Sequence, residues 1–186
     1  LMALLAVHMD SENHLIERTL VSTVMSNLGL ERFITGQGMT LLRTPVGDRY
    51  VVEQMREGSF NLGGEQSGHI VLADYGRTGD GLLAALQILT ILKQKGGKAS
   101  DTLHLFDPLP QILKNVRVSG EVKPLDKAEV QDALARANET LSNDGRLLVR
   151  ASGTEPLIRV MAEGDDLQLI ERVVDDLCAL IAEAGQ

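Results

Sequence analysis

The spacing of hydrophobic residues in the first part of the chain indicates strands that alternate with helices. Short apolar or β-branched runs predict strands at 19–25, 39–43 and 69–73. Apolar residues at helical spacing predict helices at 1–9, around Leu30 and Phe33, at 48–57 and at 79–95. Between these elements, the pair Gly63-Gly64 is expected to break the chain. Alternating strands and helices are typical of an α/β layer structure.

A change of pattern near residue 108 indicates a domain boundary. Asp107-Pro108-Leu109-Pro110 predicts a stiff linker after a small, polar stretch at 96–100. Beyond it, strands are predicted at 112–118, 146–151 and 157–163, and helices at 126–141 and 165–183. The first of these helices is expected to begin with a capping box, with Asp126 as N-cap and Glu129 three residues later. We therefore predict two domains, 1–108 and 109–186, the second a small α+β domain.

Composition and charge exclude several classes of function. Of the 186 residues, 44% are hydrophobic and 24% are charged, as in ordinary globular domains. The net charge of −8 disfavours binding to nucleic-acid phosphates. The longest apolar run, Leu1–Val7, is far shorter than the ~20 residues that span a membrane. The single cysteine, Cys178, excludes a disulfide framework, fits a reducing cytoplasm and is expected to be a small hydrophobic residue of the last helix.

The loop at 150–156 carries residue types that suit a phosphate. Arg150 ends one predicted strand and Arg159 lies in the next, so their guanidinium groups are expected to lie near each other across a hairpin. The loop adds two hydroxyls and a backbone that can adopt positive φ, from Ser152, Thr154 and Gly153. Arginine binds a phosphate dianion bidentately, and backbone N–H groups of such a loop add to the site. The alternative is an ordinary polar hairpin in which Glu155 pairs with an arginine.

The loop at 63–69 combines glycines with groups that bind hydroxyls. Its polar side chains are a carboxylate, an amide, a hydroxyl and an imidazole, from Glu65, Gln66, Ser67 and His69. That mixture donates and accepts hydrogen bonds, as neighbouring sugar hydroxyls do, and Glu65 can also pair with an amine. The alternative is a loop whose glycines serve turn geometry and whose His69 is an ordinary strand residue.

Other signatures of catalysis or metal binding are missing from the sequence. There is no Walker A loop, no H-E-x-x-H and no G-x-S-x-G, and Gly36-x-Gly38 does not continue into a dinucleotide fingerprint. The remaining histidines stand without partner ligands: His8, His14 and His104. No metal site is therefore predicted in this chain.

At the two loops the sequence resembles the α-D-phosphohexomutase family, and within it the enzymes that act on glucosamine phosphates. The sugar-recognition loop of the family resembles residues 64–69, and Gln66 is typical of the glucosamine-phosphate enzymes, whereas phosphomannomutases more often carry methionine there. The phosphate loop of its last domain resembles residues 150–156. Segments 23–30 and 44–49 resemble its third domain, so the similarity covers nearly the whole chain in order.

The resemblance implies a fold, a domain plan and a cofactor. Residues 1–108 are expected to be the third of four domains, a three-layer α/β/α structure with a mixed sheet. Residues 109–186 are expected to be the fourth, an antiparallel sheet with two helices, like the TATA-binding protein. Family enzymes carry a phosphorylated serine in the first domain and a Mg²⁺-binding aspartate loop in the second, and neither motif occurs here. With Leu1 in place of an initiator methionine, we expect the C-terminal half of a longer enzyme, with Mg²⁺ bound by its other half.

The implied reaction interconverts glucosamine 6-phosphate and glucosamine 1-phosphate, on the route to UDP-N-acetylglucosamine and peptidoglycan precursors. The phosphoserine phosphorylates the sugar, and glucosamine 1,6-bisphosphate turns end for end before it returns the other phosphate. The resemblance implies sugar binding by Gly64, Glu65, Gln66, Ser67 and His69, with His69 a candidate for orientation or proton transfer. It implies phosphate binding by Arg150, Ser152, Gly153, Thr154 and Arg159. Phosphoryl transfer needs the absent serine and metal, so the chain alone is expected to bind substrate without turnover.

Two alternatives stay open. The chain is a piece of a mutase for mannose or glucose phosphates, against which Gln66 argues, or it is a phosphosugar-binding module without a catalytic half. The expected partners are a phosphorylated amino sugar and the N-terminal domains of the same enzyme, with no nucleic acid and no membrane. The sequence leaves the oligomeric state, including a homodimer, undecided.

Overall fold

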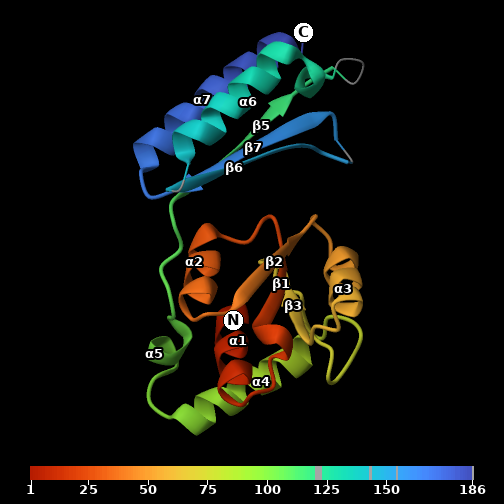
Figure 1. Ribbon diagram of the computed structural model, residues 1–186, viewed down its shortest axis with the longest axis vertical. Helices are drawn as coiled ribbons and strands as arrows, with labels where there is room; N and C mark the ends of the chain where they lie inside the picture. The colour runs from red at the N-terminus through yellow and green to blue at the C-terminus, as the bar shows by residue number, and fades with distance from the viewer. Residues whose placement is uncertain (120–122, 143, 154, 186) are drawn as a thin grey trace. The chain divides into compact units, whose positions relative to one another are not determined.

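A computed structural model describes residues 1–119, 123–142, 144–153 and 155–185 of the chain. These residues form two compact units, one over Leu1–Pro108 and one that begins at Leu109 (Figure 1). Each unit contains its own clusters of buried apolar side chains, so each has the core of an independent domain.

The first unit is built on a four-stranded sheet with the order β2-β1-β3-β4. Its strands are β1 (Thr19–Thr23), β2 (Thr40–Thr44), β3 (Leu62–Gly64) and β4 (Ile70–Leu72). β1 runs parallel to β2 and β3, whereas β4 runs antiparallel to β3. The sheet is therefore mixed, as expected.

Helices cover both faces of this sheet and make three layers. They are α1 (Met2–Ser11), α2 (Leu28–Gly36), α3 (Asp48–Glu57), α4 (Gly81–Lys95) and the short α5 (Ala99–Leu103), with a 3₁₀ turn, η1, at Ile16–Arg18. Leu20 of β1 packs in the core shared with α1, α2 and α4, whereas Val21 packs in the core shared with α3. Successive side chains of a strand point to opposite faces, so one short apolar strand serves two cores. This arrangement confirms the predicted α/β/α fold.

The prediction that Gly63 and Gly64 break the chain is wrong, because both residues lie in β3. A Cβ on Gly63 would lie 2.4 Å from Sδ of Met55 on α3, and a Cβ on Gly64 would lie 2.6 Å from the carbonyl oxygen of His69. Glycine is required here because α3 and the adjacent chain approach the strand closely.

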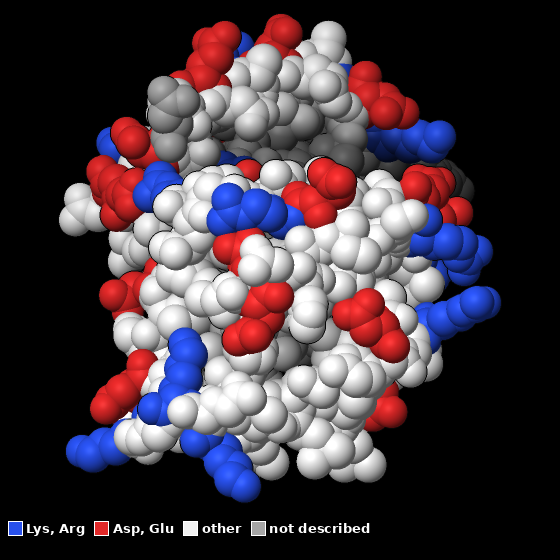
Figure 2. Space-filling view, turned by 60° about the horizontal axis from the view of Figure 1, so that its bottom comes forward, with Lys and Arg blue, Asp and Glu red and all other residues white. Residues whose placement is uncertain are grey.

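The leucines whose spacing predicted α4 lie mostly on its exposed side. Leu82, Leu86 and Leu89 are 80%, 61% and 59% exposed, whereas Ile88 and Ile91 are buried. Figure 2 turns the α4 side of the molecule toward the viewer and shows charged side chains around a largely uncharged area. The apolar pattern therefore located the helix without identifying its buried face. None of the helices in the described ranges is both long enough and apolar enough to cross a membrane.

The second unit combines three antiparallel strands, in the order β5-β7-β6, with two helices (Figure 1). Its elements are β5 (Gln111–Arg117), the 3₁₀ turn η2 (Pro124–Asp126), α6 (Ala128–Leu141), β6 (Gly145–Ala151), β7 (Leu157–Gly164) and α7 (Leu167–Ala184). Val130 of α6 and Val174 of α7 pack in one core with Ile158 and Val160 of β7. Both helices thus cover one face of the sheet, and this confirms the predicted α+β fold. We call the opposite face, which carries none of the described helices of this unit, the helix-free face.

The two helix starts of this unit differ in their caps. Asp166 caps α7, where its Oδ1 accepts hydrogen bonds from the N–H groups of Gln168 and Leu169 at 2.9 and 3.1 Å. α6 begins behind Lys127, and Asp126 belongs to η2, so the predicted capping box is wrong. Proline favours the start of such a turn, and Pro124 therefore shifts the helix start past Asp126.

Candidate functional site

Three loops of the first unit lie at the carboxyl ends of its parallel strands. They follow β1, β2 and β3 at residues 24–27, 45–47 and 65–69. Carboxyl ends of parallel strands share one edge of a sheet, and open α/β sheets bind ligands beyond that edge. Most of the residues that the sequence suggested for sugar binding belong to the third loop, so they lie where this fold type takes a ligand.

The third loop is a hairpin that closes β3 onto β4. The Glu65 N–H donates to the His69 carbonyl at 2.9 Å, and the Gly68 N–H donates to the Glu65 carbonyl at 3.0 Å. Gly68 adopts a φ of +96°, which would strain any other residue. Oγ of Ser67 lies 3.1 Å from Nδ1 of His69. The exposed side chains of the turn are an amide, a hydroxyl and an imidazole, from Gln66, Ser67 and His69.

Glu65 links this hairpin to the loop after β2. Its Oε1 accepts a hydrogen bond from the N–H of Gly47 at 3.0 Å, and Gly47 is the N-cap of α3. A carboxylate near a helix N-terminus is stabilised by the helix dipole. Within the described ranges Oε2 of Glu65 has no hydrogen-bond partner, so it can accept one from a ligand. Glu65 is thus an anchor of the loop and a candidate binding group.

The loop after β1 is held by Arg43, which the sequence analysis missed. Nη1 of Arg43 donates to the carbonyl oxygens of Ser26 at 2.6 Å and Thr23 at 3.2 Å. Its Nε and Nη2 donate to Oε2 of Glu31 at 3.0 and 2.8 Å. In the sequence, Arg43 is a charged residue beside apolar neighbours in a predicted strand. Such a position indicates a charge that is partly buried and paired.

A short chain of hydrogen bonds continues from this loop to the sugar-loop strand. Oγ of Ser26 lies 2.5 Å from Oγ of Ser22, which donates to the carbonyl oxygen of Gly64 at 2.8 Å. Beside these groups a cavity of about 150 Å³ is lined in part by Asn27 and Gln66. The loops after β1 and β3 are therefore coupled, and Gln66 contributes to the hollow between them.

In the second unit, the two predicted arginines lie directly opposite each other. Arg150 of β6 pairs with Arg159 of β7, and Asn115 of β5 pairs with Arg159 on its other side. The alternate residues of β7 at 158 and 160 face the helices, so this row lies on the helix-free face. Beyond the end of β6, the Ser152 N–H donates to the Leu157 carbonyl at 2.8 Å and continues the ladder toward the hairpin tip.

The positive charge of this row is only partly balanced. Nη2 of Arg159 lies 3.7 Å from Oε2 of Glu155, too far for a hydrogen bond. Nε of Arg159 is buried and has no hydrogen-bond partner. Arg150 makes no ion pair or hydrogen bond with another side chain in the described part of the chain. Like charges directly opposite each other destabilise an antiparallel pair, and an anion between the two arginines would relieve that repulsion. The ion pair between Arg159 and Glu155 is the one expected of an ordinary polar hairpin, so that alternative stays open.

Gly153 lies near the tip of this hairpin. Its φ is not in the left-handed region, and a Cβ there would meet no atom within 4 Å. Neither a left-handed backbone nor a close contact therefore requires glycine at this position. Thr154 lies outside the described residues.

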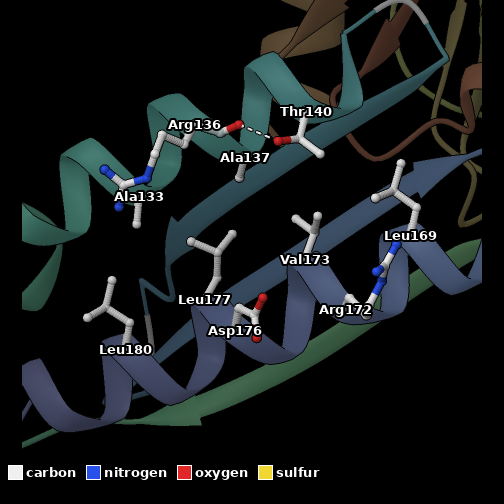
Figure 3. A pocket seen from close by; sticks show the side chains of 10 residues that line it. All are labelled: Ala133, Arg136, Ala137, Thr140, Leu169, Arg172, Val173, Asp176, Leu177 and Leu180. Carbon is white, nitrogen blue, oxygen red and sulfur yellow. Dashed lines mark hydrogen bonds between the residues drawn. The ribbon is translucent and has the colours of Figure 1, made fainter.

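Other features of the described residues give less indication of a functional site. The described residues contain no group of three or more metal-ligating side chains. Burial raises the pKa of the Cys178 thiol on α7, which makes this cysteine a poor nucleophile, as expected. A groove of about 530 Å³ separates α6 from α7, where Ala133 and Ala137 point toward Val173 and Leu177 (Figure 3). None of the predicted site residues lines this groove.

Comparisons with known proteins show the family to which the chain belongs. The family profile described as "Phosphoglucomutase/phosphomannomutase, alpha/beta/alpha domain III" matches residues 1–109, and the profile of the C-terminal domain of the same family matches residues 113–180. A phosphoglucosamine mutase of Rhodopseudomonas palustris is 55% identical over 185 residues, and that of Allorhizobium ampelinum is 58% identical over 186 residues. Both matches cover 100% of this chain, which spans 41% of the length of these curated relatives.

Solved structures give the same picture of the fold. The N-acetylphosphoglucosamine mutase of Aspergillus fumigatus matches with a TM-score of 0.79 and 21% identity, over 99% of this chain and 43% of that one. A phosphoglucomutase/phosphomannomutase family protein of Burkholderia thailandensis matches with a TM-score of 0.72 and 22% identity, over 98% of this chain and 41% of that one. At such identities the likeness supports the fold alone.

Proposed function

Because the chain belongs to the phosphoglucomutase/phosphomannomutase family, we propose that it is the substrate-holding part of a phosphoglucosamine mutase. The reaction interconverts glucosamine 6-phosphate and glucosamine 1-phosphate through the 1,6-bisphosphate. The observation that carries the proposal is the directly opposed, incompletely neutralised pair Arg150 and Arg159 on the helix-free face. The choice of glucosamine is supported by the relatives of that name, which are 55% and 58% identical.

The second unit holds the phosphate that is not reacting. A bisphosphate that turns end for end needs one fixed anion site, because either phosphate must occupy it while the other reacts. Two guanidinium groups bind a dianion with paired hydrogen bonds, and the anion removes the repulsion between them. Ser152 and Gly153 add a hydroxyl and backbone donors at the adjoining hairpin tip, and the sequence suggests the hydroxyl of Thr154 as a further donor.

The first unit binds the sugar ring. Oε2 of Glu65 accepts a hydrogen bond from a hydroxyl or from the protonated amine of glucosamine, while Oε1 stays anchored to Gly47. Ser67 and His69 lie together on the exposed turn and serve the neighbouring hydroxyls, while Gly64 keeps the backbone close to the sugar. The imidazole of His69 is the candidate for orienting or moving a proton, since histidine exchanges protons near neutral pH.

The phosphoryl donor and Mg²⁺ belong to other domains of the longer enzyme in this proposal. The described residues do not fit a metal ion, because no three ligating side chains gather among them, so no step on this chain passes through Mg²⁺. Phosphoryl transfer depends on metal charge and on the position of the donor. The chain alone therefore binds the sugar phosphate without turnover.

Two assays test the proposal. The chain is mixed with glucosamine 6-phosphate, a trace of the 1,6-bisphosphate and Mg²⁺, and product formation is compared with that of a heat-killed control. Binding of glucosamine 6-phosphate is then measured by titration calorimetry for the chain and for Arg150→Ala. We expect no turnover, and a loss of affinity of about 10- to 100-fold in the variant, the usual effect of lost charged hydrogen bonds. Turnover by the chain alone, or unchanged binding in the variant, contradicts the proposal.

The main competing substrates are the phosphates of mannose and glucose. Gln66 lines a cavity together with Asn27, and this position supports a contact between its amide and the sugar. In the full-length enzyme, Gln66→Met should narrow the ratio of kcat/KM for glucosamine over glucose phosphates. An unchanged ratio would show that Gln66 does not determine the preference for glucosamine phosphates, and it would leave the family assignment intact.

A further inference from the structure

The helix-free face of the second unit carries two different kinds of arginine. At one end, Arg146 donates from Nε to Oε1 of the fully buried Glu163 at 2.8 Å, and its Nη2 donates to the same oxygen. At the other end lies the row of Arg150 and Arg159, whose side chains make, among the described residues, one long ion-pair contact, from Arg159 to Glu155. The sheet thus neutralises a structural arginine with a buried carboxylate and leaves the other end cationic.

A third arginine joins the cationic end. Arg117 is the last residue of β5, two residues after Asn115, which pairs with Arg159. Residues two apart on a strand share a face, so Arg117 lies on the helix-free face, diagonal to Arg159. Diagonal neighbours have Cβ atoms roughly 7–8 Å apart, within reach of long side chains. Arg117 is exposed and makes no ion pair or hydrogen bond with another side chain of the described ranges.

This end of the face therefore carries three arginines and the carboxylate of Glu155, in a chain whose net charge is −8. A phosphate monoester carries about −1.5 to −2 charges at pH 7 and has three terminal oxygens that accept hydrogen bonds. Arg150 and Arg159, with the carboxylate of Glu155 beside them, carry two positive charges and one negative one, so they leave part of the phosphate's charge and of its acceptor capacity unmatched. We propose that Arg117 is a third phosphate ligand, which makes the site selective for the dianion. The inference rests on the proposed function, because it adds a residue to the same phosphate site.

Substitution of single arginines tests this role. Arg117→Gln, Arg117→Lys and Arg150→Gln are compared in the 186-residue chain by titration calorimetry with glucosamine 6-phosphate and with inorganic phosphate. Arg136→Gln is the matched control, because Arg136 is an exposed arginine of α6 on the other side of the sheet. We expect Arg117→Gln to weaken binding by about 10- to 100-fold, Arg117→Lys to weaken it less, and Arg136→Gln to leave it unchanged.

The pH dependence separates a ligand from a structural residue. The second ionisation of a phosphate monoester lies near pH 6, so affinity for a site that prefers the dianion rises between pH 5 and pH 7. We expect this rise to be smaller in Arg117→Gln than in the parent chain, a change that altered folding would not produce. If Arg150→Gln weakens binding and Arg117→Gln does not, the role of Arg117 is wrong and the proposed function stands. If neither substitution affects binding, the phosphate site itself is wrong.

Discussion

Replacing Arg146 with leucine is expected to destabilise the second unit, because the buried carboxylate of Glu163 would lose its ion pair with Arg146. Glu163 is fully buried, while the Arg146 side chain is 20% exposed. Removing one partner of a buried ion pair typically costs about 3–5 kcal/mol. Water can reach the exposed part of the pair, so we expect a loss at or below the lower limit of that range, about 2–3 kcal/mol.

The double variant Arg146→Leu/Glu163→Leu is the matched control for this pair. It replaces both charged groups by apolar ones of similar size, and such replacements of buried ion pairs are often neutral or stabilising. We therefore expect the double variant to recover most of the stability that either single variant loses.

Amide hydrogen exchange in β6 and β7 measures the opening of the second unit directly. A loss of 2–3 kcal/mol corresponds to exchange about 30- to 150-fold faster at the most protected amides. The chain has no tryptophan, and its two tyrosines, Tyr50 and Tyr75, both lie in the first unit. Tyrosine fluorescence therefore reports on the unfolding of the first unit alone, and we expect Arg146→Leu to leave that transition unchanged. A loss below about 0.5 kcal/mol in Arg146→Leu, or a double variant less stable than both single variants, would refute the reasoning.

Three further substitutions or reactions have expected outcomes. Gly63→Ala should destabilise the first unit by about 1–3 kcal/mol in urea unfolding followed by tyrosine fluorescence, because its Cβ would overlap Sδ of Met55. Gly153→Ala should change the free energy of unfolding by less than about 0.5 kcal/mol, since its Cβ would meet no atom within 4 Å. The same variant should weaken phosphate binding in calorimetry, and unchanged binding would argue against a ligand at this position. Because burial raises the pKa of the Cys178 thiol, alkylation at pH 8 followed by mass spectrometry should be slower than that of free cysteine and should reach the free rate in denaturant; a fast native rate would show an accessible thiolate.

Local sequence patterns were sufficient to predict the elements and the hairpin of the second unit. Strand β1 was predicted from the run Thr19–Thr23, and α7 from the periodic spacing of its apolar residues. Both patterns lie within one short segment, so they can be read without knowing the rest of the fold. Arg150 and Arg159 could be paired before the structure was known, because a tight hairpin brings residues close in the sequence into register. Glycine was the less reliable signal: the same residue marks a turn at Gly68 and a tight packing contact at Gly63.

Only the tertiary structure decided which distant residues share a face or an edge. Arg117 lies 42 positions before Arg159, and only the pairing of β5 with β7 brings it to the cationic end of the helix-free face. The role of Arg43 likewise depends on β2 lying beside β1, which puts its guanidinium against the carbonyl oxygens of Thr23 and Ser26. Strand order and register are set by burial summed over a whole core, so no local pattern contains them. The sequence by itself therefore determined most of the helices and strands and suggested the two candidate loops, whereas the assembled sheets decided which charged residues meet.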